Sequence, residues 1–338
     1  MNDCGIVVIG RNEGERLQSC LRALRASNTR IVYVDSGSTD SSVAFARGIG
    51  VEVVELDTSI PFSAARARNE GMEKLLTQWP DTPFVQFVDG DVILDSDWIP
   101  KAIAYLSDHL DAAVVCGRLR EEFRDASVYN RLLDLEWNVP AGDVKSCGGI
   151  ALMRTSLFRS VGGFNATVIA AEEDELCLRM RELGYRIVRL PDEMGKHDGR
   201  MTHFTQWWTR TKRSGYAYAQ GFFLHGRSSE KHFLRQLTSA FVWGFILPTV
   251  VIIVSFVSPF ASLMLLLLYP LLLVKIYLRK RREMVGSADA FSYAFFVALA
   301  KFPQWLGIVQ FVVRTIFGVR HKIIEYKTPI MLPATDKQ

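Results

Sequence analysis

Short apolar runs alternate with helical patterns along the first two thirds of the chain. Each run is bounded by polar or glycine residues, as is typical of a buried strand, and the runs cover residues 4–9, 31–34, 51–56, 84–88, 148–153 and 187–190. Between them, apolar side chains recur at the spacing of one helix face, which predicts helices near residues 17–24, 42–47, 64–79 and 173–183. Residues 112–143 mix strand-like and amphipathic pieces whose order the pattern does not fix. The alternation predicts an α/β domain with a mostly parallel sheet that is covered on both faces.

Polar clusters follow three of the predicted strands. Asn12 follows the first strand, Asp35 the second and Asp89 the fourth. In open α/β sheets, ligands bind beyond the carboxyl ends of the strands. The sequence therefore predicts that these three clusters meet at one crevice.

Two long apolar stretches begin near residue 240. They cover residues 240–257 and about 260–278, are separated by Ser258-Pro259, and each approaches the roughly 20 residues that a spanning helix needs. We expect a transmembrane hairpin; the alternative is a helical hairpin buried inside a soluble protein. Basic residues precede the first stretch, and Arg279–Arg282 follow the second, so the positive-inside rule places both flanks in the cytoplasm.

A third apolar stretch, at about 291–313, contains Lys301 and Pro303. We expect an interfacial helix rather than a third span, because a span would carry the basic residues behind it to the outside.

The first residues lack the basic and apolar segments of a signal peptide. The prediction is a multi-pass protein of the inner, cytoplasmic membrane. It has a cytoplasmic domain at 1–235, a membrane region at 236–318 and a basic cytoplasmic tail at 319–338.

Charge and cysteine content narrow the class of partner. The 338 residues carry a formal net charge of +4, which is too small to indicate nucleic acid, whereas the basic flanks of the hairpin suit membrane lipid. The five cysteines form no Cys-x-x-Cys pair and fall in apolar stretches, which predicts buried, reduced thiols.

The tripeptide Asp89-Gly90-Asp91 ends a buried strand. Mg²⁺ and Mn²⁺ prefer carboxylate oxygens, and a closely spaced pair can hold the ion while leaving positions for phosphate oxygens. The ion would neutralise a diphosphate leaving group. Without its context, the same tripeptide is also a common turn.

Two further segments suit a nucleotide. Asp35-Ser36-Gly37-Ser38-Thr39-Asp40 is small, polar and rich in acceptors, so Asp35, Ser36 and Ser38 are candidates for holding a nucleoside. In the alternative interpretation, Ser38 or Thr39 caps the next helix. Arg68 lies in a predicted helix and could reach a diphosphate with its fork of donors, or could belong to a solvated helix face.

Together these motifs resemble those of the family 2 glycosyltransferases over about the first two thirds of the chain. The resemblance implies a Rossmann-like GT-A catalytic domain, a nucleotide-diphosphate sugar donor, and Mg²⁺ or Mn²⁺ bound by Asp89 and Asp91. In the family, the segment similar to Gly10-Arg11-Asn12-Glu13 and the aspartate similar to Asp35 hold the nucleotide. The segment similar to Arg68-Asn69 lies near the diphosphate.

The family's catalytic base is an aspartate in a Glu-Asp-x-x-Leu-x-x-Arg segment, which resembles Glu172–Arg179 here. Counting back from Leu176 and Arg179, the base position falls on Glu173, with Asp174 one place beyond. The chain departs from the family pattern at this point, so either carboxylate can be the base. Inverting transfer needs one such base within reach of the acceptor hydroxyl. The alternative is an acidic helix N-terminus that the helix dipole stabilises.

Other candidates belong to the acceptor or phosphate side. Gly148-Gly149 and Gly162-Gly163-Phe164 resemble the family's acceptor-side loops, and Glu172 joins them. The segment Gln206-Trp207-Trp208-Thr209-Arg210 is similar to the Gln-x-x-Arg-Trp signature of processive members without reproducing it. Arg210, Lys212 and Arg213 could contact a diphosphate or a lipid phosphate, or anchor the chain at the interface. His197 is a candidate metal or phosphate contact, with a structural role as its alternative.

The resemblance and the hairpin together predict metal-dependent, inverting sugar transfer in polysaccharide biosynthesis. The acceptor would be a hydroxyl of a polyprenyl-linked or growing glycan at the inner membrane face. One alternative is a synthase that charges polyprenyl phosphate itself, and another is a non-catalytic scaffold that binds nucleotide sugars. A processive synthase is disfavoured because one hairpin offers few helices for a channel.

Overall fold

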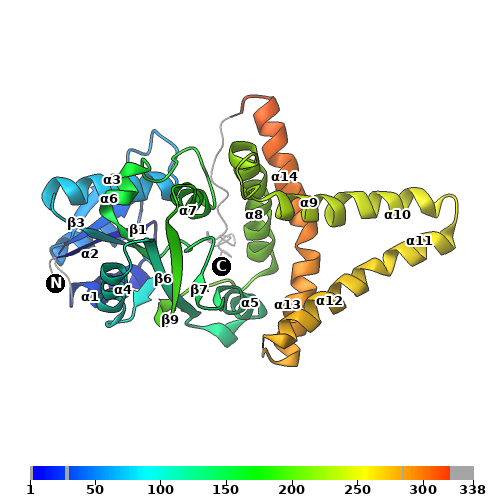
Figure 1. Cartoon of the computed structure of the whole chain (residues 1–338), viewed down its shortest axis with the longest axis horizontal. Coiled ribbons are helices and arrows are strands. Elements are labelled where there is room, and N and C mark those ends of the chain that lie inside the picture. Colours follow the sequence, from blue (N-terminus) through cyan, green and yellow to red (C-terminus); the bar gives the residue numbers. More distant parts are fainter. Residues whose placement is uncertain (1–2, 27–29, 284, 320–338) are drawn as a thin grey trace, which may run out of the picture.

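The computed structural model describes residues 3–26, 30–283 and 285–319. Figure 1 shows an α/β domain on one side and a projecting helical region on the other. Nine strands form one sheet in the described residues: β1 (Cys4–Gly10), β2 (Ile31–Asp35), β3 (Glu52–Glu55), β4 (Phe84–Asp89), β5 (Val92–Leu94), β6 (Ala112–Glu121), β7 (Gly142–Asp143), β8 (Ala151–Arg154) and β9 (Arg186–His197). Their order is β3-β2-β1-β4-β8-β6-β9-β5, and β7 also pairs with β9.

The first half of the sheet is parallel, as the sequence predicts. β3, β2, β1 and β4 pair in parallel with their neighbours. Side chains of β1, β2 and β4 are buried over nearly their whole length because helices cover both faces, which is why these strands read as continuous apolar runs. The carboxyl ends of β1, β2 and β4 therefore lie at one edge.

The second half of the sheet is mixed. β8 is antiparallel to β4 and β6, while β6 and β9 are parallel to each other. The strand expected at 187–190 is longer than predicted and runs through Pro191 to His197. The strand expected at 148–153 begins only at Ala151, so Gly148 and Gly149 lie in the loop before it. Mixed pairing does not alter the α/β class, and that prediction is confirmed.

Helices of this domain connect the strands and cover the sheet. They are α1 (Glu15–Arg25), α2 (Ser42–Gly48), α3 (Ala64–Gln78), α4 (Trp98–Asp108), α5 (Val128–Trp137), α6 (Thr155–Ser160) and α7 (Glu172–Glu182), with a 3₁₀ turn at Arg124–Ala126. The stretch at 112–143 that the pattern left unordered contains β6, α5 and β7. α3 packs closely on the sheet, since a Cβ added at Gly71 would lie 2.4 Å from Val7 Cγ1. All five cysteines are buried and free, as predicted.

The helical region begins with α8 (Phe204–His225), which packs beside the α/β domain. α9 (Leu234–Phe241), a π-helical segment (Val242–Ile246) and α10 (Leu247–Ser255) follow as one rod. α11 (Pro259–Leu266) and α12 (Leu268–Arg282) return from its tip at an angle, so that the hairpin is V-shaped. α13 (Ser287–Leu299) and α14 (Lys301–Ile316) complete the region. Three helical segments are long and apolar enough to cross a membrane by length and composition, namely Leu234–Ser255, Pro259–Arg282 and Ser287–Ile316.

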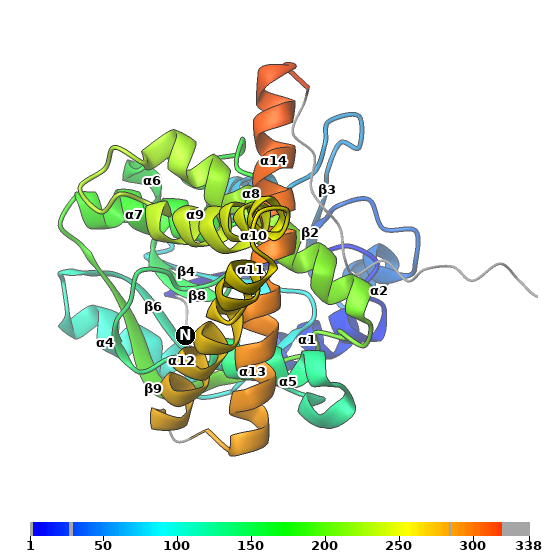
Figure 2. The same cartoon turned by 90° about the vertical axis from the view of Figure 1, so that its right-hand side faces the viewer.

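The hairpin of α9 to α12 projects away from the α/β domain (Figures 1 and 2). Its helices are longer than the stretches predicted at 240–257 and 260–278. Apolar side chains at its tip are exposed, including Phe256 at 86% and Val257 at 85%. The alternative of a hairpin buried within a soluble fold is therefore wrong for the described chain, because no protein core covers these side chains.

α13 and α14 run across the base of the hairpin rather than along it (Figures 1 and 2). α14 packs on α8 at a point of backbone contact. A Cβ added at Gly215 would lie 1.9 Å from Gln304 O, and one added at Gly307 would lie 2.0 Å from Lys212 O. Only glycine permits this approach. The predicted tail at 319–338 lies, apart from Val319, outside the described residues.

Candidate functional site

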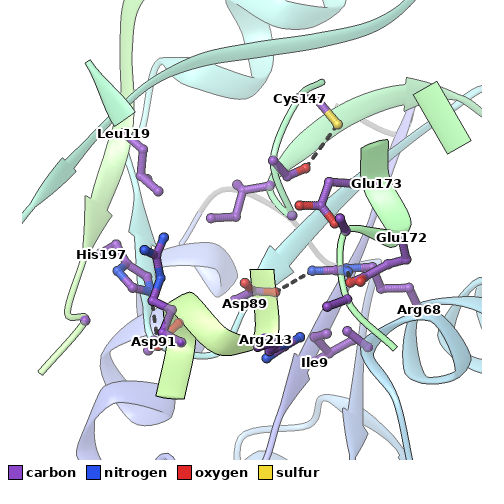
Figure 3. Close-up of a pocket in the computed structure, with 18 of the residues that line it drawn as sticks. Ile9, Arg68, Asp89, Asp91, Leu119, Cys147, Glu172, Glu173, His197 and Arg213 are labelled. Carbon is purple, nitrogen blue, oxygen red and sulfur yellow. Dashed lines mark hydrogen bonds and ion pairs between the residues drawn. The ribbon is translucent and has the colours of Figure 1, made fainter. Parts of the chain in front are cut away.

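A cavity of about 790 Å³ lies at the carboxyl edge of the sheet, between α7 and α8. It brings together most of the candidates that the sequence singles out: Arg11, Asn12, Glu13, Ser36, Arg68, Asp89, Asp91, Gly148, Gly149, Glu172, Glu173, Asp174, His197 and Arg210. Figure 3 shows side chains from both halves of the domain pointing into this space. The convergence expected from strand ends is therefore present.

The loops after β1 and β2 are joined to each other at one end of the cavity. Asn12 N donates to Ser38 Oγ at 2.9 Å, and Asn12 Oδ1 accepts from Thr39 N at 2.7 Å. Asn12 has φ 53°, a left-handed conformation that asparagine tolerates better than most residues. Ser38 and Thr39 thus fix the loop geometry, and neither caps α2, whose N-cap residue is Ser41. Beside this loop, the Arg11 guanidinium lies 4.5 Å from the ring centre of Phe62.

Asp35 is buried beneath this end of the cavity and does not line it. Its carboxylate accepts from Gly37 N at 2.9 Å, Ser38 N at 2.7 Å and the Tyr33 hydroxyl at 2.8 Å. The same carboxylate also accepts from Ser38 Oγ. These hydrogen bonds hold the Ser36–Ser38 turn, so Asp35 shapes the loop that faces the cavity.

Asp89 and Asp91 both line the cavity, at the end of β4 and just before β5. The Asp89 side chain is 33% exposed. Asp91 is buried, and its Oδ2 lies 3.2 Å from His197 Nε2. His197 ends β9 and reaches Asp91 because the strand is longer than predicted. The structure therefore places His197 next to one of the two carboxylates.

The space around Asp89 is kept open by a glycine. A Cβ added at Gly149 would lie 3.3 Å from Asp89 Oδ2 and 2.4 Å from Arg68 Nη2. Among the described residues, no group of three or more His, Cys, Asp and Glu side chains is arranged to hold a metal by itself. Two carboxylates that line a cavity are nonetheless a donor set that suits a hard cation sharing its other positions with phosphate or water. The residues present fit Mg²⁺ or Mn²⁺ on these terms.

Arg68 has a different setting from the one the sequence suggests. It is only 2% exposed, Nη2 donates to Asp89 Oδ1 at 2.9 Å and Nη1 donates to Glu172 Oε1 at 2.6 Å. Burial lowers the pKa of Arg68, but the charges of Asp89 and Glu172 outweigh it and the pKa is raised overall. The solvated helix face is therefore wrong for Arg68. The guanidinium connects the end of β4 to the start of α7.

Glu173 and Asp174 lie in the first turn of α7 and line the cavity. The N-cap residue, Ala171, has φ 59°, which is strained for alanine and fixes the direction in which the helix starts. Burial, followed by the charges of Glu172 and Asp174, raises the pKa of Glu173 to about 8. Burial also raises the pKa of Asp174 to about 6, while a hydrogen bond from Ser146 opposes the rise. Figure 3 shows Glu173 pointing into the cavity.

Besides Asp35 and Ser38, three predicted site residues do not line the cavity. Asn69 holds the Phe164 backbone, donating to its carbonyl at 2.7 Å and accepting from its amide at 2.9 Å. Gln206 caps α8 by accepting from the backbone of Thr202 and His203. Trp207 is buried in a cluster of apolar side chains. All three support the walls of the site from behind.

The sequence identified one wall of the cavity only through Arg210 and Arg213, as candidate phosphate contacts. It is formed by α8 and the start of α9, and its residues include Arg213, Ser214, Ala217, Tyr218, Phe233 and Gln236. On α8, the lining positions recur at the spacing of one helix face, counted from Arg210. That periodicity was the available signal. Trp137, at the end of α5, and Arg189, on β9, also line the cavity. Their positions depend on the packing of α5 on β6 and on the pairing of β6 with β9, which the sequence does not show.

Comparison with known proteins supports one family. Two protein-family models match the chain. The family model described as "Glycosyl transferase family 2" matches residues 5–159. The family model described as "Glycosyl transferase family group 2" matches residues 111–299, which is more than half of the chain.

Two curated relatives are each similar to more than half of the chain. The pre-mycofactocin glycosyltransferase of Mycobacterium tuberculosis is 29% identical over 222 residues, which cover 62% of this chain and 45% of the relative. The O-antigen chain rhamnosyltransferase RfbN of Salmonella typhimurium is 25% identical over 216 residues, which cover 58% of this chain and 67% of the relative. The chain thus spans about half the length of the mycobacterial relative.

A solved structure shares the fold. The mannosyltransferase PcManGT from Pyrobaculum calidifontis, in complex with GDP-Man and Mn²⁺, superposes with a TM-score of 0.59 at 16% sequence identity, covering 90% of this chain and 87% of the other. The architecture is accordingly the GT-A fold, with the apolar helices following it in the chain.

Proposed function

The chain belongs to the family 2 glycosyltransferases, and from this premise we propose that it moves a sugar from a nucleotide-diphosphate donor to an acceptor hydroxyl. The acceptor is a lipid-linked or growing glycan, and transfer proceeds with inversion at the cytoplasmic face of the inner membrane. One observation carries the proposal. A single cavity holds Asp89 and Asp91 from the end of β4 together with Glu173 and Asp174 from the start of α7.

The two carboxylate pairs divide the chemistry between them. Asp89 and Asp91 would hold Mg²⁺ or Mn²⁺, which supplies positive charge to the departing diphosphate when bound. Glu173 or Asp174 accepts the proton of the acceptor hydroxyl, while the hydroxyl oxygen forms a bond to the anomeric carbon of the donor sugar. The bond from that carbon to the diphosphate oxygen breaks on the opposite face, and no covalent enzyme intermediate is needed.

A second group of cavity residues supports binding of the donor. Arg11, Asn12 and Ser36 line the end at β1 and β2, where parallel sheets bind nucleotides. Asp35 and Ser38 hold that loop from beneath. The mannosyltransferase PcManGT, which shares this fold, was solved in complex with GDP-Man and Mn²⁺, so GDP-sugars are the first donors to test.

The helical region supports a membrane location. We assign the catalytic domain to 1–235 and the membrane region to 236–318, with the hairpin of α9 to α12 as the anchor. Its basic ends and exposed apolar tip favour insertion from the cytoplasmic side. An anchored enzyme keeps a lipid-linked acceptor within reach of the cavity.

Glu173 and Asp174 also favour this function over charging a polyprenyl phosphate. A phosphate acceptor is already ionised and needs no base, whereas a hydroxyl acceptor needs one.

The proposed function is tested by measuring nucleotide release by the purified protein, given a panel of nucleotide sugars, lipid-linked glycan acceptors and Mn²⁺. The double variant Glu173→Gln/Asp174→Asn serves as the reference.

Release that exceeds the double variant supports the proposal. Equal release from both proteins on a polyprenyl phosphate would favour the phosphate-charging synthase. Nucleotide-sugar binding without any release would favour a non-catalytic scaffold.

A further inference from the structure

Arg213 differs from other arginines at the cavity in what it contacts. Arg16, Arg68 and Arg210 are each ion-paired with a carboxylate. Arg213 donates only to the Ile169 carbonyl, at 3.4 Å, and no acidic side chain pairs with it within the described chain. Figure 3 shows its guanidinium pointing into the cavity from α8. A cation so placed is available to an anionic ligand.

Arg189 is another cavity arginine for which the described residues provide no carboxylate partner, but its donors are engaged differently. Its Nη1 donates to the carbonyls of Trp137 at 3.1 Å and Gly117 at 3.5 Å. These contacts hold Arg189 against the β6 and α5 side of the cavity. Arg213 makes only one long hydrogen bond, so it loses less hydrogen-bond energy than Arg189 would when its guanidinium turns to a ligand.

The position of Arg213 relates it to the acceptor half of the site. Its partner Ile169 leads directly into Ala170 and Ala171, which line the cavity and precede Glu172. The donor-side loops, by contrast, belong to the ends of β1 and β2. Arg213 therefore lies beside the segment that carries the proposed base.

The wall that bears Arg213 continues toward the hairpin. Ser214 and Tyr218 follow on the same face of α8, and Phe233 and Gln236 extend the lining into α9. α9 begins the first of the long apolar segments. A lipid-linked molecule that approaches along the hairpin would meet this wall before it reaches Glu173.

We infer that Arg213 binds a phosphate group of a lipid-linked acceptor, an inference that rests on the proposed function. A guanidinium presents planar paired donors that match phosphate oxygens. The phosphate would act as a handle and would leave the glycan hydroxyl free to meet Glu173 or Asp174. Phosphate oxygens also occur in the donor diphosphate, and the location of Arg213 on α8 favours the acceptor as their source.

Binding of simple probes tests the inference on the full chain in detergent. The probes are farnesyl phosphate, its uncharged analogue farnesol, and GDP or UDP with Mn²⁺. The variant is Arg213→Gln, and Lys212→Gln is the matched control because it removes a positive charge from the neighbouring position, which does not line the cavity. We expect Arg213→Gln to weaken farnesyl phosphate binding by about tenfold or more, as loss of a charge-assisted contact does. Farnesol and nucleotide binding should be unchanged, and Arg213→Lys should restore part of the phosphate affinity.

Two results would overturn the inference. In the first, Arg213→Gln binds farnesyl phosphate as well as Lys212→Gln does. In the second, Arg213→Gln loses nucleotide affinity by the same factor, which would assign the guanidinium to the donor. Since binding is measured without turnover, these outcomes are separate from a failure of the proposed function, which appears as absent nucleotide release by the wild-type protein. Unchanged thermal unfolding of both variants excludes misfolding as the cause.

Discussion

Arg68 and Glu172 form a buried ion pair of 2.6 Å although 104 positions separate them in the chain. The same guanidinium also reaches Asp89 at 2.9 Å. One side chain of α3 therefore fixes the end of β4, which carries the proposed metal site, relative to the start of α7, which carries the proposed base. The distance between the proposed metal site and the proposed base therefore depends on this contact.

Replacement of Arg68 should destabilise the domain strongly. Arg68→Met leaves the buried Glu172 carboxylate without its partner, and breaking a buried pair in this way costs about 3–5 kcal/mol. The exposed pair between Arg47 and Glu55 provides the control, because Arg47→Met should cost at most about 1 kcal/mol. Thermal and denaturant unfolding of both variants measure the difference. Equal midpoints for the two would show that the buried pair contributes no more than a surface one.

The pH dependence of turnover should identify the base. A carboxylate must be deprotonated to accept a proton, so kcat/KM rises as the pH passes upward through its pKa. Burial and neighbouring charges raise the pKa of Glu173 to about 8, and burial raises that of Asp174 to about 6. If Glu173 is the base, activity is half-maximal near pH 8 and falls below it. A limb near pH 6 would assign the role to Asp174, and a flat profile from pH 5 to 9 would contradict both.

Single substitutions in α7 give an independent assignment. Asp174 already accepts a hydrogen bond from Ser146, whereas Glu173 points into the cavity, so Glu173 is the better candidate. Glu173→Gln should lower kcat by about 10²- to 10⁴-fold, the usual contribution of a general base. Asp174→Asn should have the smaller effect. Glu182→Gln, at the exposed end of the same helix, should leave turnover unchanged, and a loss there would point to a general effect of helix charge.

Removal of divalent metal should abolish transfer. Treatment with EDTA is expected to lower nucleotide release by at least about 100-fold, and Mn²⁺ or Mg²⁺ should restore it, because the diphosphate then departs with its charge neutralised. Asp89→Asn and Asp91→Asn should lose the metal-dependent part of nucleotide binding. Asp97→Asn, on an exposed residue of the next helix start, is the matched control. Full activity in EDTA would exclude the assigned role of the two aspartates.

Local patterns in the sequence were sufficient for much of this architecture. Buried parallel strands must be continuous apolar runs, so β1, β2 and β4 could be found, and with them the shared edge that holds Asn12 and Asp89. The hairpin could be found because apolar stretches of this length without a charge are typical of helices that span a bilayer. These features depend on residues that are neighbours in the chain.

Features that depend on distant contacts could not be predicted. The insertion of antiparallel β8 between β4 and β6 leaves no local signature. Arg68 was expected either near a diphosphate or on a solvated helix face, and its ion pair with Glu172 was not foreseen because Glu172 comes from another part of the chain. Gln206 belongs to a motif-like segment, yet its amide is engaged in capping α8. Residue type indicates the available chemistry, and tertiary contacts decide whether a side chain uses it at the cavity.

The last prediction concerns residues 287–316, which we assign to the membrane interface. The segment has 30 residues, so as a helix of about 1.5 Å per residue it would be roughly 45 Å long, well beyond a bilayer core of about 30 Å. α14 also contacts α8 through Gly215 and Gly307, and α8 lines the cavity. A helix attached to the catalytic domain in this way has to stay on the same side of the membrane as that domain.

Labelling of single cysteines distinguishes a segment that lies at the membrane interface from one that crosses the bilayer. The native cysteines are buried, so Gly286→Cys before the segment and Val319→Cys after it can be probed with an impermeant maleimide. Both should react in inverted vesicles and neither in spheroplasts, whereas Val257→Cys at the exposed hairpin tip should react in spheroplasts. Val319→Cys that reacts only from the outside would mean that the segment crosses the bilayer. The contact between α14 and α8 could not then persist in the membrane, because one helix would lie in lipid and the other in the cytoplasm.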